Sequence, residues 1–283
     1  MTTDVFLAVL SAAALHAVWN ALAKGGLDKT VGMAAIVLGR AAFATPLLFI
    51  LPAPAPEAWP FIGIGIVLHV GYQLFLIESY RIGDLTQVYP IARGSAPLIV
   101  AAVSTVFLGV ELGRFEVIAI LLIGIGLISL SLVRQSDGMR NMKAGLLAFG
   151  TGCFIASYSL NDGTGARLAG HAFGFYSWMT VGNGLAVAAL LLPRKRYVFK
   201  AVLTDARLTA TFGAVASFLA YGLVNWAFTK APIAVVTALR ETSIVFALLI
   251  GVVFLKERLN LAKVAVTAII LSGAALLRLS KNG

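Results

Sequence analysis

Long apolar runs separated by short polar connections make up most of this sequence. A helix needs roughly 20 mostly apolar residues to cross a bilayer, and such runs recur along the whole chain. They cover residues 5–23, 31–51, 58–80, 85–107, 115–133, 144–162, 172–193, 207–229, 232–255 and 259–279. They lack the alternation of polar and apolar residues that is typical of β-barrel strands. The pattern predicts an all-α integral membrane protein with ten transmembrane helices.

Composition agrees with this pattern and argues against several functional classes. Hydrophobic residues make up 60% of the 283 residues and charged residues only 12%, about half the charged share of a soluble globular protein. The net charge of +10 does not indicate nucleic acid, because the basic residues lie at the ends of apolar segments rather than on one helix face. Soluble enzymes and nucleic-acid-binding proteins do not fit. A disulfide scaffold does not fit either, since Cys153 is the single cysteine.

The two halves of the chain carry the same polar and small residues at nearly the same interval. The corresponding pairs are Tyr72 and Tyr221, Arg93 and Arg240, and Gly126 and Gly273. This similarity predicts two repeats of five helices, 1–138 and 139–283. Because five is odd, the second repeat enters the membrane from the opposite side, and inverted repeats are a recurring design of secondary transporters.

A family resemblance follows from the end of each predicted repeat. Phe254, Leu255 and Glu257 form a Phe-Leu-x-Glu turn before a Gly-containing last helix, and Phe107–Leu112 carries a variant of it. With ten helices in two halves, the chain resembles the drug/metabolite transporter superfamily, specifically its EamA-like branch. Within that branch it is most similar to the YddG-type aromatic amino-acid exporters. The resemblance implies a multi-pass exporter of amino acids or related metabolites in the bacterial inner membrane.

The resemblance does not extend to the proton site of the small multidrug members of the superfamily. Those four-helix proteins bind protons with a membrane-embedded glutamate in their first helix. Here the first predicted helix carries His16 and Asn20 instead. The resemblance therefore brings no proton coupling to this chain.

Three arginines lie deep inside predicted membrane segments, namely Arg40, Arg93 and Arg240. An ionisable residue in hydrocarbon is costly, so it usually faces a cavity or a partner. A guanidinium matches a carboxylate with its fork of donors. These arginines are either substrate ligands or structural partners of Glu78 and Glu241 that lock helices together.

The polar and aromatic residues around these arginines suit a zwitterionic amino acid. We expect Arg93 and Arg240 to bind its carboxylate, and Glu241 or an amide to accept from its ammonium group. Aromatic side chains would bind its ring. The predicted binding residues are Trp19, Asn20, Tyr89, Arg93, Tyr158, Trp178, Tyr221, Asn225, Trp226, Arg240 and Glu241. The sequence also predicts that Pro90 and Pro97 interrupt their helix, and that Asp162 is solvated at a helix end.

The leading function is export of neutral or aromatic amino acids by alternating access between the two repeats. The second reading is a carrier for phosphorylated metabolites or nucleotide sugars, because three arginines would also bind phosphate. A membrane enzyme is the third, but no H-E-x-x-H, Asp-rich or G-x-S-x-G motif is present. We expect no metal or cofactor, no nucleic acid, and a functional monomer in the lipid bilayer.

Overall fold

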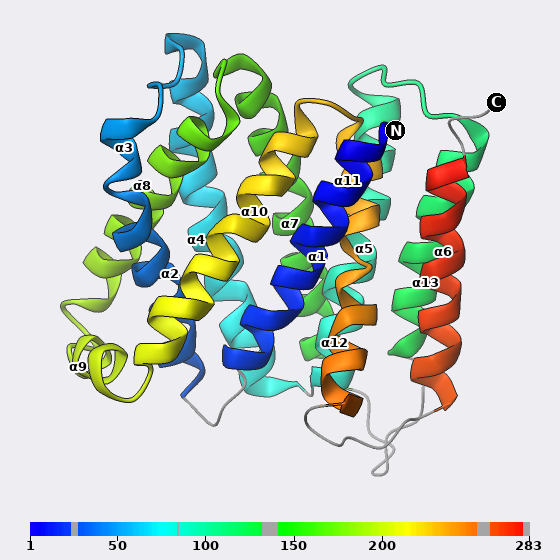
Figure 1. Cartoon of the computed structure of the whole chain (residues 1–283). Helices are drawn as coiled ribbons and strands as arrows, with labels where there is room; N and C mark the ends of the chain where they lie inside the picture. The colour runs from blue at the N-terminus through cyan, green and yellow to red at the C-terminus, as the bar shows by residue number, and fades with distance from the viewer. Residues whose placement is uncertain (24–27, 84, 132–140, 254–260, 280–283) are drawn as a thin grey trace.

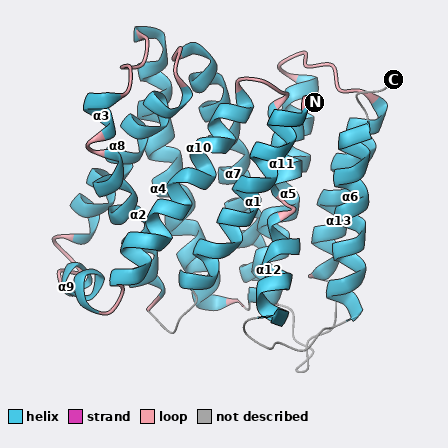
Figure 2. Cartoon of the chain, in the orientation of Figure 1, coloured by secondary structure: helices cyan, strands magenta, loops and turns pink. Residues whose placement is uncertain are grey.

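The computed structural model describes residues 1–23, 28–83, 85–131, 141–253 and 261–279. The Phe-Leu-x-Glu turn at 254–257 lies outside these residues. The secondary structure of the described residues is helical, with loops and turns between the helices, as Figure 2 shows. In order, the helices are α1 (Thr3–Ala23), α2 (Lys29–Ala44), α3 (Leu47–Ile50), η1 (Pro56–Ala58), α4 (Trp59–Ile82), α5 (Leu85–Val106), α6 (Arg114–Leu130), α7 (Met142–Leu168), α8 (Ala172–Leu191), α9 (Tyr197–Thr204), η2 (Thr209–Gly213), α10 (Ala214–Phe228), α11 (Ile233–Arg240), α12 (Ser243–Val253) and α13 (Leu261–Leu279).

Every predicted apolar segment contains a helix or two consecutive helices. Five stretches of the described chain are long and apolar enough to cross a membrane: Thr3–Leu22, Lys29–Ile50, Pro56–Ile82, Thr209–Phe228 and Ile233–Val253. Val264–Leu279 is a shorter apolar helix. Large apolar side chains such as Leu7, Val67 and Leu185 point outward and are more than half exposed, as lipid-facing residues are. The all-helical membrane character of the chain is therefore confirmed.

The helices form one bundle in which neighbours along the chain are often not neighbours in space (Figure 1). Helix α7 packs against both α4 and α5, α1 packs against α10 and α12, and α6 packs against α13. Small residues permit the closest of these approaches. A Cβ atom added at Gly94 of α5 would lie 2.7 Å from the carbonyl oxygen of Gly124 in α6. Helix α1 begins and α13 ends at the same end of the bundle, the upper end in Figure 1.

Two local predictions are wrong. Helix α5 runs without a break from Leu85 to Val106 with Pro90 and Pro97 inside it, so these prolines do not interrupt it. The break lies instead in the second half of the chain, where α11 ends at Arg240 and α12 begins at Ser243. Helix α7 continues to Leu168, beyond the predicted end at residue 162. Asp162 is consequently inside the bundle and fully buried rather than solvated.

Candidate binding cavity

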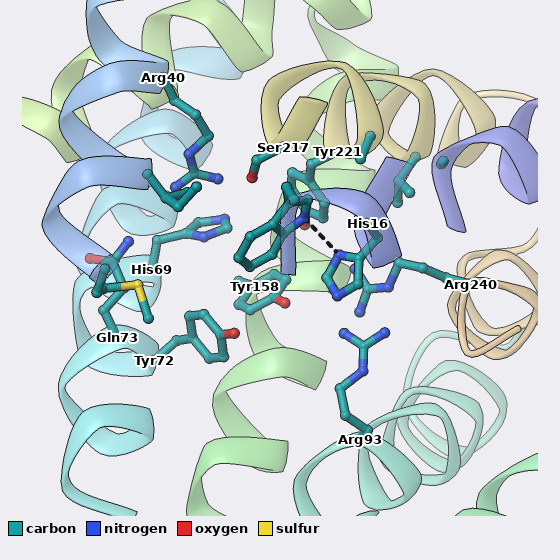
Figure 3. Close-up of a pocket in the computed structure, with 16 residues that line it drawn as sticks. His16, Arg40, His69, Tyr72, Gln73, Arg93, Tyr158, Ser217, Tyr221 and Arg240 are labelled. Carbon is teal, nitrogen blue, oxygen red and sulfur yellow. Dashed lines mark hydrogen bonds between the residues drawn. The ribbon is translucent and has the colours of Figure 1, made fainter. Parts of the chain in front are cut away.

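A cavity of about 70 Å³ lies in the middle of the bundle, enough for a few water molecules. Figure 3 shows its lining, which comes from seven helices: Ala12, His16 and Trp19 of α1; Met33, Ile36 and Arg40 of α2; His69, Tyr72 and Gln73 of α4; Arg93 of α5; Tyr158 of α7; Ser217, Ala220, Tyr221 and Val224 of α10; and Arg240 of α11. The three membrane arginines therefore open on one space, together with two histidines and several aromatic rings.

Arg93 is held by the buried carboxylate at the break between α11 and α12. Its Nε donates a hydrogen bond to Oε2 of Glu241 at 2.8 Å, and both side chains are less than a tenth exposed. The Nη2 of Arg93 has no hydrogen-bond partner within the described residues. The pair thus fixes the guanidinium while leaving part of its donor fork open.

Arg240 and Arg40 keep more of their donors open. The Nε of Arg240 lies 4.0 Å from Oε1 of Glu241, too far for a hydrogen bond, and in the described chain neither Nε nor Nη2 has a partner. Arg40 makes one long contact, from Nη1 to the hydroxyl of Tyr176 at 3.4 Å. Buried donors without partners are costly, so these arginines are suited to an anion that supplies the missing acceptors.

Aromatic rings surround the space between the arginines. Trp19 donates from Nε1 to Nδ1 of His16 at 3.3 Å, and both side chains line the cavity together with Tyr158. Tyr158 makes edge contacts with Tyr72, at 5.5 Å between ring centroids, and with Tyr221, at 5.8 Å. The guanidinium of Arg240 lies 5.8 Å from the ring centroid of Tyr221. Cationic and apolar surfaces are thus presented together.

The structure brings together part of the predicted binding set. Arg93, Arg240, Trp19, Tyr158 and Tyr221 line the cavity. The remaining members are not among its lining residues. Their side chains make the following contacts: Glu241 binds Arg93; the ring centroid of Tyr89 lies 6.0 Å from the Arg93 guanidinium; Asn20 donates to the carbonyl of His16; Asn225 donates to the carbonyl of Tyr221; Trp178 packs edge-on against Trp59; and Trp226 packs against the apolar core.

Several lining residues were not in the predicted set: His16, Arg40, His69, Tyr72 and Gln73. The four-residue spacing of His69 and Gln73, which places them on one helix face, was the signal in the sequence for two of them. Gln73 donates from Nε2 to Oδ1 of Asn183 at 2.9 Å. Its Oε1 has no partner among the residues described. Gln73, a lining residue, therefore has a buried neutral acceptor without a partner.

The alternative prediction, that the arginines pair with Glu78 and Glu241, holds for Glu241 and not for Glu78. Glu241 does bind Arg93, but Glu78 forms an exposed pair with Arg81 of its own helix at 2.6 Å. Glu78 lies near the end of α4, where Arg81 is its partner, and it does not pair with Arg40. Searched over the described residues, the chain has no group of three or more His, Cys, Asp or Glu side chains that could hold a metal ion.

Comparison with known proteins gives the family. The model of the EamA-like transporter family matches residues 4–132 and again residues 142–279. The chain belongs to the EamA-like transporter family. As a member of this family it is a membrane transporter rather than an enzyme. The family model thus occurs twice, once on each side of the segment 133–141.

Solved structures support the fold of this EamA-like protein. One, titled only "Crystal structure of protein", superposes with a TM-score of 0.73 over 99% of this chain and 98% of its own. At 16% sequence identity, the likeness shows the fold alone. No curated protein matches the sequence significantly.

Proposed function

We propose that this chain exports neutral or aromatic amino acids across the bacterial inner membrane through the central cavity. In this proposal, ten transmembrane helices form two inverted five-helix repeats, 1–138 and 139–283, that alternate access to the cavity. The observation that carries it is the convergence of open guanidinium donors and aromatic rings on one buried space. Both family matches contribute to the lining, with Arg93 from the first and Arg240 from the second.

The chemistry of the lining supports an amino acid with a ring. Its carboxylate would accept from Nη2 of Arg93 and from the open nitrogens of Arg240. Its ammonium group would donate to Oε1 of Gln73 and lie against a tyrosine face, an arrangement favourable to cations. Glu241 also has an oxygen without a hydrogen-bond partner among the described residues, Oε1. It does not line the cavity and its Oε2 already accepts from Arg93, so the proposal assigns the ammonium group to Gln73. Trp19 and Tyr158 would pack on the substrate's ring.

The size of the cavity supports alternating access. Sites for small molecules usually enclose some hundreds of cubic ångströms, and this one measures about 70 Å³. A substrate therefore requires the two repeats to separate around it. In secondary transporters with inverted repeats, rocking of one repeat against the other exposes a fixed central site to each side in turn.

A second candidate function rests on the positive charge of the cavity lining. Arg40, Arg93 and Arg240 line the cavity, whereas no aspartate or glutamate is among its described lining residues. Such an excess of cations would also suit the doubly charged phosphate of a phosphorylated metabolite or nucleotide sugar.

Exchange by the purified protein in liposomes distinguishes the two candidates. Vesicles are loaded with one unlabelled compound, and uptake of its labelled form is measured for phenylalanine, leucine, a sugar phosphate and a nucleotide sugar. We expect exchange of phenylalanine and leucine, and none in liposomes without protein. Exchange of the phosphate compounds alone would establish the second candidate and overturn the first.

A further inference from the structure

A buried cluster of polar side chains lies against the cavity on the side of α4. Asp162 of α7, which is fully buried, lies with Oδ2 2.8 Å from Nε2 of His69. The same oxygen accepts a hydrogen bond from the hydroxyl of Tyr221 at 2.9 Å, and Oδ1 accepts one from Asn161 at 3.1 Å. The cluster joins α4, α7 and α10. Tyr221 also lines the cavity, whereas the proposed amino-acid site gives His69 and Asp162 no role.

His69 connects this buried carboxylate to the cavity. Its ring lines the cavity and stacks on Tyr158 with 4.3 Å between the centroids. Because a carboxylate only accepts hydrogen bonds, Nε2 of His69 carries the hydrogen and Nδ1 of the neutral ring has a free lone pair. Among the described residues no hydrogen bond engages Nδ1. This arrangement is that of a proton acceptor whose tautomer and charge are supported by an aspartate.

We propose that His69 and Asp162 form a proton-binding site that exchanges protons with the cavity. A proton from cavity water bonds to Nδ1 of His69, which becomes an imidazolium, and the Nε2–H hydrogen bond to Asp162 becomes an ion pair. On release, the Nδ1–H bond breaks and the proton returns to water. Tyr221 and Asn161 continue to donate to Asp162 in both states, so the carboxylate remains solvated by the protein.

The groups that face this pair determine its response to pH. They are Arg40 from α2, Tyr72 from α4 itself, Tyr158 from α7, Tyr176 from α8 and Tyr221 from α10. Arg40 opposes an added positive charge, and Asp162 favours it. Figure 3 shows Arg93, Arg240 and His16 on the other side of the cavity from His69. Asp162 is therefore the carboxylate that compensates the imidazolium, while Glu241 compensates Arg93.

The location of the proton site predicts whether proton binding strengthens or weakens amino-acid binding. This step rests on the proposed amino-acid function. Gln73, the proposed acceptor for the ammonium group, lies one turn beyond His69 on the same face of α4. Two cations at adjacent positions compete, so the amino acid and the proton each lower the affinity of the site for the other. Such competition makes the transporter an antiporter, in which protons entering the cell drive amino acids out.

Histidine NMR tests the proton site without any substrate. The protein is labelled in its histidine rings, placed in nanodiscs and titrated with acid, and the His69 signals are assigned by their loss in His69→Gln. We expect His69 to gain a proton reversibly, and to gain it only at lower pH in Asp162→Asn. A His69 ring that does not titrate, or that titrates identically in Asp162→Asn, overturns the proposal.

Transport by a double variant tests the coupling. His69→Gln with Asp162→Asn keeps a donor and an acceptor of similar size between α4 and α7 but contains no titratable group. Vesicles with an acidic lumen and a clamped membrane potential should accumulate external phenylalanine about tenfold per pH unit for one proton per molecule. Any phenylalanine exchange that the double variant retains should occur without accumulation, whereas His171→Gln at the start of α8 should accumulate phenylalanine normally.

The outcomes separate this proposal from the proposed substrate. Equal accumulation by the wild type and the double variant overturns the coupling. A double variant that neither exchanges nor keeps the wild-type melting temperature indicates a structural role only, and then the single variant Asp162→Asn decides through its NMR titration. Absence of phenylalanine exchange in the wild type contradicts the amino-acid function, while the titration of His69 still decides the proton site.

Discussion

Arg93 of α5 donates from Nε to Oε2 of Glu241 at 2.8 Å, across 148 residues of sequence and with both side chains buried. The bond joins a helix of the first family match to the break between α11 and α12 in the second. It also sets the charge of the cavity, because Glu241 is shared by Arg93 and, more loosely, by Arg240. One carboxylate thus links α5 to the break between α11 and α12 and is the counter-ion of the arginines on that side of the cavity.

Removal of that carboxylate should destabilise the protein. Glu241→Gln leaves Arg93 without a buried counter-ion, a change that typically costs about 3–5 kcal/mol. Thermal unfolding in detergent measures the loss. The control is Glu78→Gln in the exposed pair with Arg81, which should cost no more than about 1 kcal/mol. Equal effects of the two substitutions would show that the buried pair has no special role.

The aromatic wall of the cavity should determine selectivity among amino acids. Trp19 lines the cavity, whereas Trp178 packs against Trp59 with 5.0 Å between ring centroids. Aromatic pairs contribute about 0.5–1.5 kcal/mol beyond burial, so Trp19→Ala should reduce the preference for phenylalanine over alanine roughly 2- to 12-fold. Competition assays in liposomes measure this preference. A larger change in Trp178→Ala than in Trp19→Ala would mean that the substrate's ring binds outside the described cavity.

Alternating access should change the exposure of a cavity residue during transport. Ser217 lines the cavity and is 4% exposed, so a cysteine there should react with a polar maleimide only when the repeats separate. In a Cys153→Ser background, we expect the reaction rate of Ser217→Cys to change when phenylalanine is added. Thr204→Cys in the exposed part of α9 should react at a constant rate. A Ser217→Cys that stays unreactive under all conditions contradicts access through this cavity.

The basic loops should face the cytoplasm. Most lysines and arginines outside the three membrane arginines follow the first, third, fifth, seventh and ninth predicted segments, and positive charge favours the inner side. Arg194, Lys195 and Arg196, before α9, lie at the lower end of the bundle in Figure 1, opposite the start of α1. An enzyme that is active only in the periplasm should therefore work when fused to the C-terminus and fail when inserted after Arg196. The reverse result would invert the orientation.

The positions of the helices could be predicted from the sequence because the length of an apolar run is a local property. The convergence of Arg93 and Arg240 was also predictable, since residues at equal positions in two repeats meet at the repeat interface. Asp162 was expected to be solvated because the apolar run ends at residue 162, just before the glycines at 163 and 165. In the structure these glycines are packing positions, since a Cβ at Gly165 would lie 2.6 Å from the ring of Phe175.

The amides of the predicted site could not be assigned from spacing alone. Asn20 and Asn225 lie on helix faces close to the cavity, yet each donates to the carbonyl four residues earlier in its own helix. Whether such an amide faces the cavity or bonds to its own helix depends on the direction of its side chain. That direction is set by packing between helices that are distant in the sequence. The pairing of Glu241 with Arg93 could not be predicted for the same reason, because Arg93 becomes its neighbour only when α5 packs against α11.

The central claim, that Arg240 binds the substrate's carboxylate, is tested most directly by a cycle that alters protein and ligand together. Binding of phenylalanine and of phenethylamine, which lacks the carboxylate, is measured for the wild type and for Arg240→Gln. A buried charge pair that loses one partner typically costs about 2–5 kcal/mol. The wild type should therefore prefer phenylalanine by that amount, and Arg240→Gln should lose most of the preference. An Arg240→Gln variant that folds and keeps the full preference would contradict the account.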